Sequence, residues 1–393
     1  MAKQGAENTD IRSARKKQKR KRHFVTFVVV MVLIIVSGSV FLLRDKWLPM
    51  LEGILDKPKE TIVNDGTLEA GNFPIELSGS GNTKLYTFNE YFVSLDDSSI
   101  KMFDLSGNVQ NTIMHTLAHP TAVVSGKRML IYENGGNSFE VVNKNGELFS
   151  KKLDDNILFA TMADNITVTV TQTDKYDGML TAYDENGSEI YHWAANKRIM
   201  SVTVKKDGSG CYISTFTSVD GQMTSVIHDI DFDSSDDKMV SDTLETLVVG
   251  VCKNDAGDIW AVGDTKLYKI NDSGVVIESF EYSGRLLSYT LSGKVCAVAT
   301  EGITRNTSRL MIFNCDDTDI KGDVEITSGS VKALRCVDDR IFMLSESSAE
   351  CYDINASLTA TAAVSNDYVD FVYLDDALIF IGYRDINKIT FKN

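Results

Sequence analysis

The segment KINDSGVV, residues 269–276, shows the pattern that decides the fold. A short strand ends in an apolar-x-Asn step, a turn containing Gly follows at once, and a second β-branched run begins. Gly and Asn favour tight turns between strands, so the segment predicts an antiparallel hairpin.

The same unit recurs along the chain. Further copies are MFDLSGNV (102–109), VVNKNGEL (141–148), AYDENGSEI (182–190), IFNCDDTDI (312–320) and CYDINASL (351–358), with a weaker copy in HDIDFDSSDD (228–237). The marker residues Asp104, Asn143, Asp184, Asp231, Asn271, Asn314 and Asp353 lie 39 to 47 positions apart. GYRDINKITF (382–391) supplies an eighth copy. A period near 40 residues is typical of stacked repeats.

Each marker strand belongs to a group of four strands. Leu247–Cys252 and Asp258–Val262 precede the strand Lys266–Ile270, and Val275–Phe280 follows it. Four antiparallel strands repeated at this period predict an all-β fold, a β-propeller, because radial packing buries both faces of each sheet. We count eight blades; seven is the alternative, because the copy at 206–245 is irregular.

Ring closure is predicted to use both ends of the domain. The last copy ends at Asn393 after its third strand, and Thr67–Leu77, which contains FPIEL, has no hairpin partner of its own. We therefore expect 67–77 to supply the fourth strand of the last blade. The predicted propeller spans 67–393.

The N-terminus predicts a membrane anchor. Residues 24–43 read FVTFVVVMVLIIVSGSVFLL, twenty positions without a charge, which suffices to cross a bilayer as a helix. Eight Lys/Arg lie between Arg12 and Arg22, and two lie just beyond the span. The positive-inside rule then predicts a basic cytoplasmic tail (1–23), one transmembrane helix (24–43), a stalk (44–66) and an extracytoplasmic domain. A signal peptide cleaved near Ser37-Gly38-Ser39 is the alternative.

Charge is divided at the same place. Residues 1–46 hold eleven Lys/Arg and three Asp/Glu, whereas the rest of the chain holds 29 and 52. A domain this acidic should repel nucleic acid, since nucleic-acid binding depends on neutralising phosphates. The expected contacts are the lipid bilayer and a protein or cell-envelope polymer.

One segment carries a family resemblance. AYDENGSEIYHW, residues 182–193, resembles the Asp-x-x-x-Gly…Trp docking motif of quinoprotein propellers. Its Asp-to-Gly spacing is short, its Trp is offset and only this copy has one, so no quinone site is carried over. Residues 67–393 resemble quinoprotein-like and WD40-like propellers in architecture. The whole plan is similar to membrane-anchored propeller proteins of anaerobic Gram-positive bacteria, whose roles are uncharacterised.

Cysteines and histidines give no site pattern. The cysteines Cys211, Cys252, Cys296, Cys315, Cys336 and Cys351 lack CxxC spacing; those at 211 and 296 fall in second strands, and those at 252 and 336 in first strands. Small core residues are the main interpretation, and a disulfide is the alternative. His115 and His119 fall in a loop before Pro120 without the Glu of HExxH.

Acidic and aromatic residues do not form a recognised binding motif. Asp229, Asp231 and Asp233 resemble the start of a calcium loop, but Ser234 and Val240 stand where Gly and Glu are required. Trp193 and Trp260 lie in strand patterns and are expected in the core. We therefore assign no catalytic, cofactor-binding or metal-binding residue, and no cofactor.

Propellers bind ligands where the loops from fourth to first strands and from second to third strands converge. We expect these loops around His115–Pro120, Glu133–Asn137, Thr171–Gly178, Thr217–Gly221 and Thr300–Ser308 to line any site. The main hypothesis is a membrane-anchored, extracytoplasmic, non-enzymatic binding or scaffolding module. The alternative is a cell-envelope enzyme, a glycan lyase or hydrolase, with carboxylates at the channel mouth.

Overall fold

The computed structural model describes Met31 and residues 64–68, 72–77, 82–163, 165–316 and 320–391. The chain divides into two compact units, 1–61 and 62–393, and only the second is described at length. Of the predicted span 24–43 only Met31 is described, so this prediction lies outside the described residues. No helix in the described ranges is long and apolar enough to cross a membrane.

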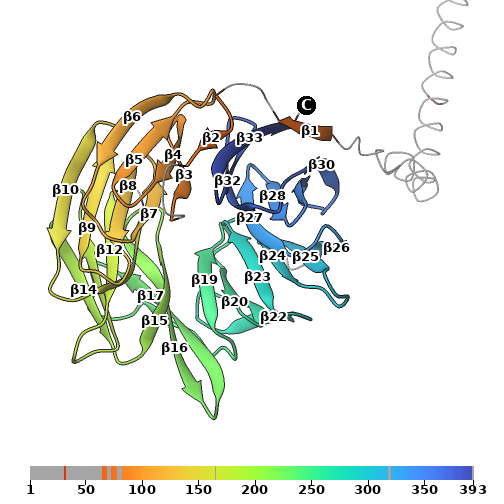
Figure 1. The fold of residues 1–393 in the computed structure, drawn as a ribbon. Coiled ribbons are helices and arrows are strands. Elements are labelled where there is room, and N and C mark those ends of the chain that lie inside the picture. The colour runs from red at the N-terminus through yellow and green to blue at the C-terminus, as the bar shows by residue number, and fades with distance from the viewer. Residues whose placement is uncertain are drawn as a thin grey trace, which may run out of the picture. The chain divides into compact units, whose positions relative to one another are not determined.

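Residues 62–393 form a ring of eight four-stranded blades (Figure 1), as the repeat predicts. Blade 1 comprises β3 (Lys84–Phe88), β4 (Tyr91–Leu95), β5 (Ser99–Phe103) and β6 (Val109–Met114). Blade 2 comprises β7 (Pro120–Ser125), β8 (Arg128–Glu133), β9 (Ser138–Asn143) and β10 (Gly146–Lys152). Blade 3 comprises β11 (Ile157–Ala163), β12 (Ile166–Thr171), β13 (Gly178–Tyr183) and β14 (Glu189–Ala195). Blade 4 comprises β15 (Arg198–Val204), β16 (Gly210–Val219), β17 (Gln222–Asp231) and β18 (Met239–Val240).

The second half of the ring repeats this plan. Blade 5 comprises β19 (Val248–Lys253), β20 (Ile259–Gly263), β21 (Lys266–Ile270) and β22 (Val276–Glu281). Blade 6 comprises β23 (Leu286–Leu291), β24 (Val295–Glu301), β25 (Ser308–Asn314) and β26 (Ile320–Ile326). Blade 7 comprises β27 (Val331–Val337), β28 (Arg340–Ser345), β29 (Ser348–Tyr352) and β30 (Leu358–Ala363). Blade 8 contains β31 (Tyr368–Leu374), β32 (Ala377–Gly382) and β33 (Asp385–Phe391).

Blade 8 takes its fourth strand from the other end of the domain. β2 (Ile75–Glu76), inside FPIEL, pairs with β33 through Ile75 opposite Ile386, which confirms the predicted closure. β1 (Asn64–Leu68) pairs with the other end of β33 and also with β30 of blade 7. The closing strand thus begins at Asn64, within the last residues of the predicted stalk.

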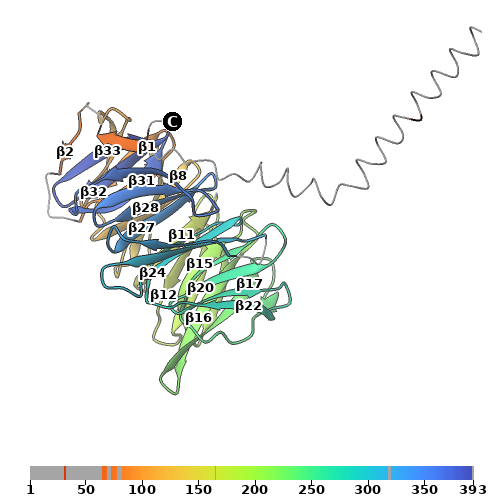
Figure 2. The ribbon, with the colours of Figure 1, turned by 90° about the vertical axis from the view of Figure 1, so that its right-hand side faces the viewer.

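The irregular copy that left the blade count open is blade 4. Its β16 and β17 are ten residues each and extend past the neighbouring hairpins, whereas β18 has two residues (Figure 2). The long hairpin of β16 and β17 lies before Asp231 and explains why the spacing from Asp184 to Asp231, 47 residues, exceeds the others. It is nevertheless a complete four-stranded sheet, which excludes the seven-bladed alternative.

Marker residues form the turns between third and fourth strands. The Asp104 carboxylate accepts hydrogen bonds from the N–H groups of Ser106 and Asn108, both at 2.9 Å. Asp184, Asn271 and Asp353 accept the equivalent pairs. Such side chains replace backbone partners in a tight turn, which is why Asp or Asn recurs there.

The core lies between blades. One cluster joins Phe88 and Met102 of blade 1 to Met129 and Ile131 of blade 2, and all four are at most 1% exposed. Equivalent clusters join the other neighbouring blades. Each sheet therefore buries both faces, the condition that predicted the ring. We call the end with the fourth-to-first and second-to-third strand loops the upper face, and the opposite end the lower face.

Candidate functional site: the upper face of the ring

A β-bulge recurs at one position of the inner strand in blades 3 to 8. The register between first and second strands shifts at Leu158, Met200, Val249, Leu287, Lys332 and Val369. Each lies near the start of its strand, beside the upper face. Bulges leave a residue unpaired and re-aim its side chain. Leu158, Met200 and Val369 are 36 to 40% exposed, unusual for apolar residues in the innermost strands.

Other apolar side chains are exposed at the same end. Met114 ends β6, Val219 ends β16, and Ile303 and Tyr383 lie in loops between second and third strands. Ile303 is 90% exposed. The remaining strongly exposed large apolar residues of the described domain lie on or beside outermost strands: Val109, Leu148, Ile190, Val240, Val275 and Ile277. The exposed apolar residues of the upper end are thus distributed over several blades.

The two faces also differ in charge. Among described residues, the loops of the lower face carry seventeen Asp/Glu and six Lys/Arg, and those of the upper face carry twelve and five. At the lower end of the described ring, Val275 lies in a turn, and the exposed residues Val109, Leu148 and Ile190 lie near the starts of outermost strands. The lower face is thus more acidic, and the upper face combines acidic groups with apolar ones.

Two adjoining hollows lie beside the ring closure, and the larger extends from the upper-face turn at Asp96–Ser99 to Phe103 and Val109 near the lower end. One, of about 450 Å³, lies between blades 8 and 1, and the other, of about 340 Å³, lies between blades 1 and 2. They share Asn82, Thr83 and Asp97. The first is lined by Ile75, Leu77 and Phe103 where β2, only two residues long, leaves the space between blades incompletely filled.

Two lysines join inner strands at this end. The Lys84 ammonium donates to the Thr121 hydroxyl (2.6 Å) and the Pro120 carbonyl (3.2 Å) of blade 2. The Lys332 ammonium donates to Asn366 and to the Tyr368 carbonyl (2.7 Å) of blade 8. Burial lowers the pKa of both lysines. Lys84 thus joins blade 1 to blade 2, and Lys332, itself at a bulge, joins blade 7 to blade 8.

The structure places the five predicted loops on the upper face, but not as one site. His119, with a left-handed φ of 48°, and Asn134 line the smaller hollow. The Glu133 carboxylate accepts the Ala118 N–H (3.0 Å) and joins these two loops. The other loops, at 171–178, 217–221 and 300–308, line neither hollow. His115 is buried, with Nε2 2.9 Å from the Asp96 carbonyl oxygen.

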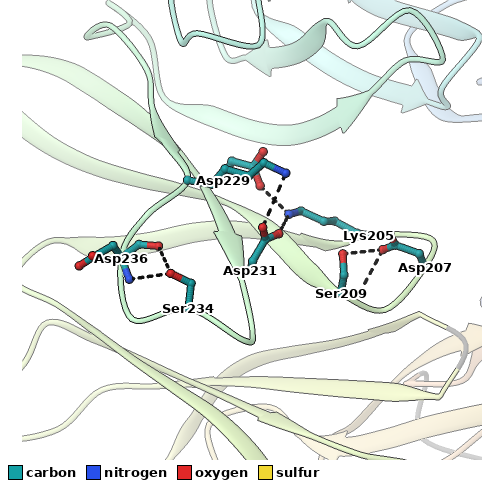
Figure 3. A network of polar contacts seen from close by, with 8 residues as sticks. Lys205, Asp207, Ser209, Asp229, Asp231, Ser234 and Asp236 are labelled. Atoms are coloured by element: carbon teal, nitrogen blue, oxygen red, sulfur yellow. Dashed lines mark hydrogen bonds and ion pairs between the residues drawn. The ribbon is translucent and has the colours of Figure 1, made fainter.

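Two of the three aspartates that resemble a calcium loop, Asp229 and Asp231, contact a lysine. Lys205 Nζ lies 2.7 Å from Asp229 Oδ1 and also contacts Asp231, as Figure 3 shows. Burial favours a lower pKa for Lys205, but the bonds to both aspartates outweigh it and raise the pKa. A protein ammonium therefore occupies the position that a bound cation would take. Among described residues no group of three His, Cys, Asp or Glu has metal-binding geometry.

Blade 4 contains a hydrogen-bonded series of a hydroxyl, an imidazole and a carboxylate that the sequence did not predict. Thr215 Oγ1 lies 3.1 Å from His228 Nε2, and His228 Nδ1 lies 2.7 Å from Asp237 Oδ2. Trp193 of blade 3 donates its indole N–H to Asp237 (3.2 Å). This order of groups is that of a catalytic triad, but Thr215 is 1% exposed and out of reach of a substrate. These hydrogen bonds therefore connect blades 3 and 4. Trp260, in contrast, is buried as expected.

All six cysteines are free thiols. Cys211, Cys296, Cys315 and Cys351 are buried in strands or at their ends, as the small-core-residue interpretation predicts, and the disulfide alternative is not observed. Burial raises the pKa of the Cys211 thiol to about 12 and that of Cys296 well above its ordinary value. Thiols held protonated by burial are poor nucleophiles.

The carboxyl groups of the upper face differ in the direction of their pKa shifts. Burial, and secondarily the charge of Asp367, raises the pKa of Asp385. For Asp96 burial acts in the same direction, but hydrogen bonds from Ser98 and Ser99 outweigh it and lower the pKa. Among described acidic residues only Asp385 and Glu140 have raised pKa values, and Glu140 lies in the third strand of blade 2. On the upper face, the carboxyl with a raised pKa is therefore Asp385, and its neighbour is Asp367.

The described domain is an eight-bladed β-propeller whose upper face carries acidic loops and exposed apolar side chains. Residues 73–391 match the family model described as "Family of unknown function (DUF5711)", and the chain belongs to this family. No curated protein matches it in sequence.

Solved structures of similar fold are WD40-like and BamB-like propellers. The C-terminal WD40 domain of Sif2 is 10% identical, with a TM-score of 0.61 over 84% of this chain and 100% of that one. BamB from Moraxella catarrhalis is 12% identical, with a TM-score of 0.55 over 82% and 99%. A chain of a mitotic checkpoint complex is 13% identical, with a TM-score of 0.50 over 74% and 91%. At these identities the likeness concerns the fold.

Proposed function

We propose that this protein is a membrane-anchored, extracytoplasmic binding module that holds a protein partner on the upper face of its propeller. The observation that carries the proposal is the asymmetry of the two faces. Exposed apolar residues from five blades lie at the upper end, among them Leu158, Met200 and Ile303. The lower-face turns are acidic and almost free of such residues.

The side chains of the upper face indicate which kind of partner surface would bind there. Interfaces combine an apolar centre with a polar rim, and partners match in charge. Here the bulge residues Leu158, Met200 and Val369 belong to the innermost strands, and the surrounding loops carry an acidic excess. The expected partner surface has apolar side chains at its centre and Lys or Arg around them. One similar propeller belongs, by its title, to a complex of proteins, which agrees with such a role.

The membrane part of the proposal rests on the N-terminal sequence. Twenty uncharged residues follow eight Lys/Arg, and the net charge changes sign across them. In intact host cells, a membrane-impermeant amine reagent should label exposed lysines of the propeller, such as Lys206 and Lys294, and spare those of the tail. Labelling of the tail before the propeller would contradict the orientation.

Site-specific photo-crosslinking tests the partner face. A photoreactive residue at Val219 or Ile303 of the full-length protein, in intact cells, should give a discrete protein adduct. Matched positions on the lower face, Asp272 and Lys294, should not. Met200→Glu should abolish the adduct without changing the melting temperature, because a charge at an exposed bulge disturbs binding but not the core. Equal adducts from both faces, or an adduct insensitive to Met200→Glu, would refute the assignment.

A further inference from the structure

The lower face contains a basic hollow that contrasts with its acidic surroundings. It has a volume of about 450 Å³ and lies where turns of blades 1 and 2 meet. Its lining is Asn89 and Glu90 from the β3–β4 turn, Lys127 and Arg128 from the β7–β8 turn, Asn143, Lys144 and Asn145 from the β9–β10 turn, and Leu148. Three cations and one carboxylate thus surround one hollow.

Its cations differ in how they are held. Arg128 Nη1 donates to the Glu185 carbonyl (3.0 Å), and the Glu185 carboxylate lies 3.9 Å from Nη2, so the neighbouring blade 3 holds the guanidinium in place. Lys127 and Lys144 make no ion pair with any described residue, and both are exposed. The charge of Lys144 contributes, after hydrogen bonds, to lowering the pKa of Glu90 in the same hollow, and Lys127 has no such neighbour among the described residues; both ammonium groups lie beside an arginine that is already oriented.

The uncharged groups of the hollow suit hydroxyls. The Asn143 Oδ1 accepts the Asn145 N–H (2.8 Å) within its turn, which leaves the amide NH₂ of Asn143 as a donor. The amides of Asn89 and Asn145 provide donors and acceptors, and the Glu90 carboxylate is a further acceptor. Leu148, 41% exposed, offers an apolar edge. A bare inorganic anion would use the cations and leave these groups without partners.

We propose that this hollow binds an anionic carbohydrate, a sugar unit that carries a phosphate or a carboxylate. The anionic group would bind Lys127, Lys144 and Arg128, while hydroxyls exchange hydrogen bonds with the asparagines and Glu90. The volume matches the smaller end of ligand pockets, which suits one or two sugar units. The surrounding acidic turns repel extended polyanions, so the site selects a short anionic unit. It lies on the face opposite the protein-binding surface, so either proposal can fail without the other.

Calorimetric titration of the full-length protein in detergent tests the site. The probes are glucose 6-phosphate, glucuronic acid, glucose and inorganic phosphate, which separate the phosphate source from the carboxylate source. At least one anionic sugar should bind tenfold or more tightly than glucose and inorganic phosphate, and binding should weaken with added salt. Equal affinity for inorganic phosphate, equal affinity for glucose, or no binding of either anionic sugar would overturn the proposal.

A matched pair of variants locates the binding. Lys127→Gln with Lys144→Gln should weaken binding at least tenfold, since charged hydrogen bonds contribute about 1.4 kcal/mol or more, one factor of ten. Lys206→Gln with Lys294→Gln removes the same charge from exposed lower-face lysines elsewhere and should leave affinity unchanged. If the double variant lowers the melting temperature, Lys144→Gln alone serves as the test. Equal losses in both pairs, or competition by a polyglutamate peptide as strong as by the sugars, would also overturn it.

Discussion

Lys205 offers the most decisive test of how the irregular blade is stabilised. Its ammonium lies between Asp229 and Asp231, and the Lys205 and Asp229 side chains are only 10% and 6% exposed. Lys205→Met keeps most of the side-chain volume and removes the charge. Asp229 then stays buried without a counter-charge, which is strongly unfavourable.

The magnitude follows from burial. Removing one partner of a buried ion pair costs about 3 kcal/mol. Asp231 is 34% exposed, so its share is largely screened by solvent and adds little. Unfolding entropy of about 2.1 cal/mol/K per residue gives roughly 0.7 kcal/mol/K for the domain, so the melting temperature should fall by about 4 °C.

Thermal unfolding of the full-length protein, followed by circular dichroism, checks this value. The matched control is Lys206→Met, at the exposed neighbouring position, which should shift the melting temperature by less than about 1 °C. Combining Lys205→Met with Asp229→Asn should recover part of the loss, because the stranded charge is gone. If Lys205→Met alone is as stable as the control, the aspartates are not compensated by this lysine and the reasoning fails.

Three further predictions concern the ring. Ile75→Asp puts a charge into the closing strand opposite Ile386 and should lower the free energy of unfolding by about 2 kcal/mol in the same assay. Glu76→Gln, at the exposed neighbouring position, should leave it unchanged, and equal effects of the two variants would contradict the closure. Arg309 lowers the pKa of Asp323, so this pair contributes stability above pH 3.8 that is lost as pH falls through the folded pKa. Arg309→Gln should therefore make the acid transition shallower, and an unchanged transition would count against it. His228→Phe should lower the free energy of unfolding by about 1 to 2 kcal/mol, because Asp237 and Thr215 lose their shared hydrogen-bond partner. The control His192→Phe, at an exposed position, should change it little. If His228→Phe instead abolishes the partner adducts at unchanged stability, His228 has a role in binding.

Local features of the ring were predictable because they are encoded within single hairpins. Asp104 and Asn271 stand out in the sequence since a turn of this geometry needs a side-chain acceptor, and the structure shows them in that role. The cysteines at 211 and 296 follow the same logic, because equivalent strand positions face equivalent cores. FPIEL was identified through topology: a blade with three strands requires a fourth.

Features that depend on register between elements were not predictable. The bulge at Met200 arises because β15 has one more residue than β16 between two paired positions. No residue type in 198–204 predicts this bulge. Thr215, His228 and Asp237 meet because β16 and β17 pair in one register, with the turn before β18 returning Asp237 to them. The basic hollow likewise joins three turns whose residues are unremarkable one at a time.

Closure and function are connected by where the chain enters the ring. β1 pairs with β30, the outer strand of blade 7, and with β33, the third strand of blade 8, so this segment lies at the periphery of those two blades. The exposed residues Leu158, Met200, Val219 and Ile303 belong to blades 3, 4 and 6. Leu158 and Met200 are bulge residues of innermost strands, so they present apolar side chains without opening the core between blades. The repeated bulge is thus compatible with both demands: it keeps the sheets packed and provides a surface for a partner.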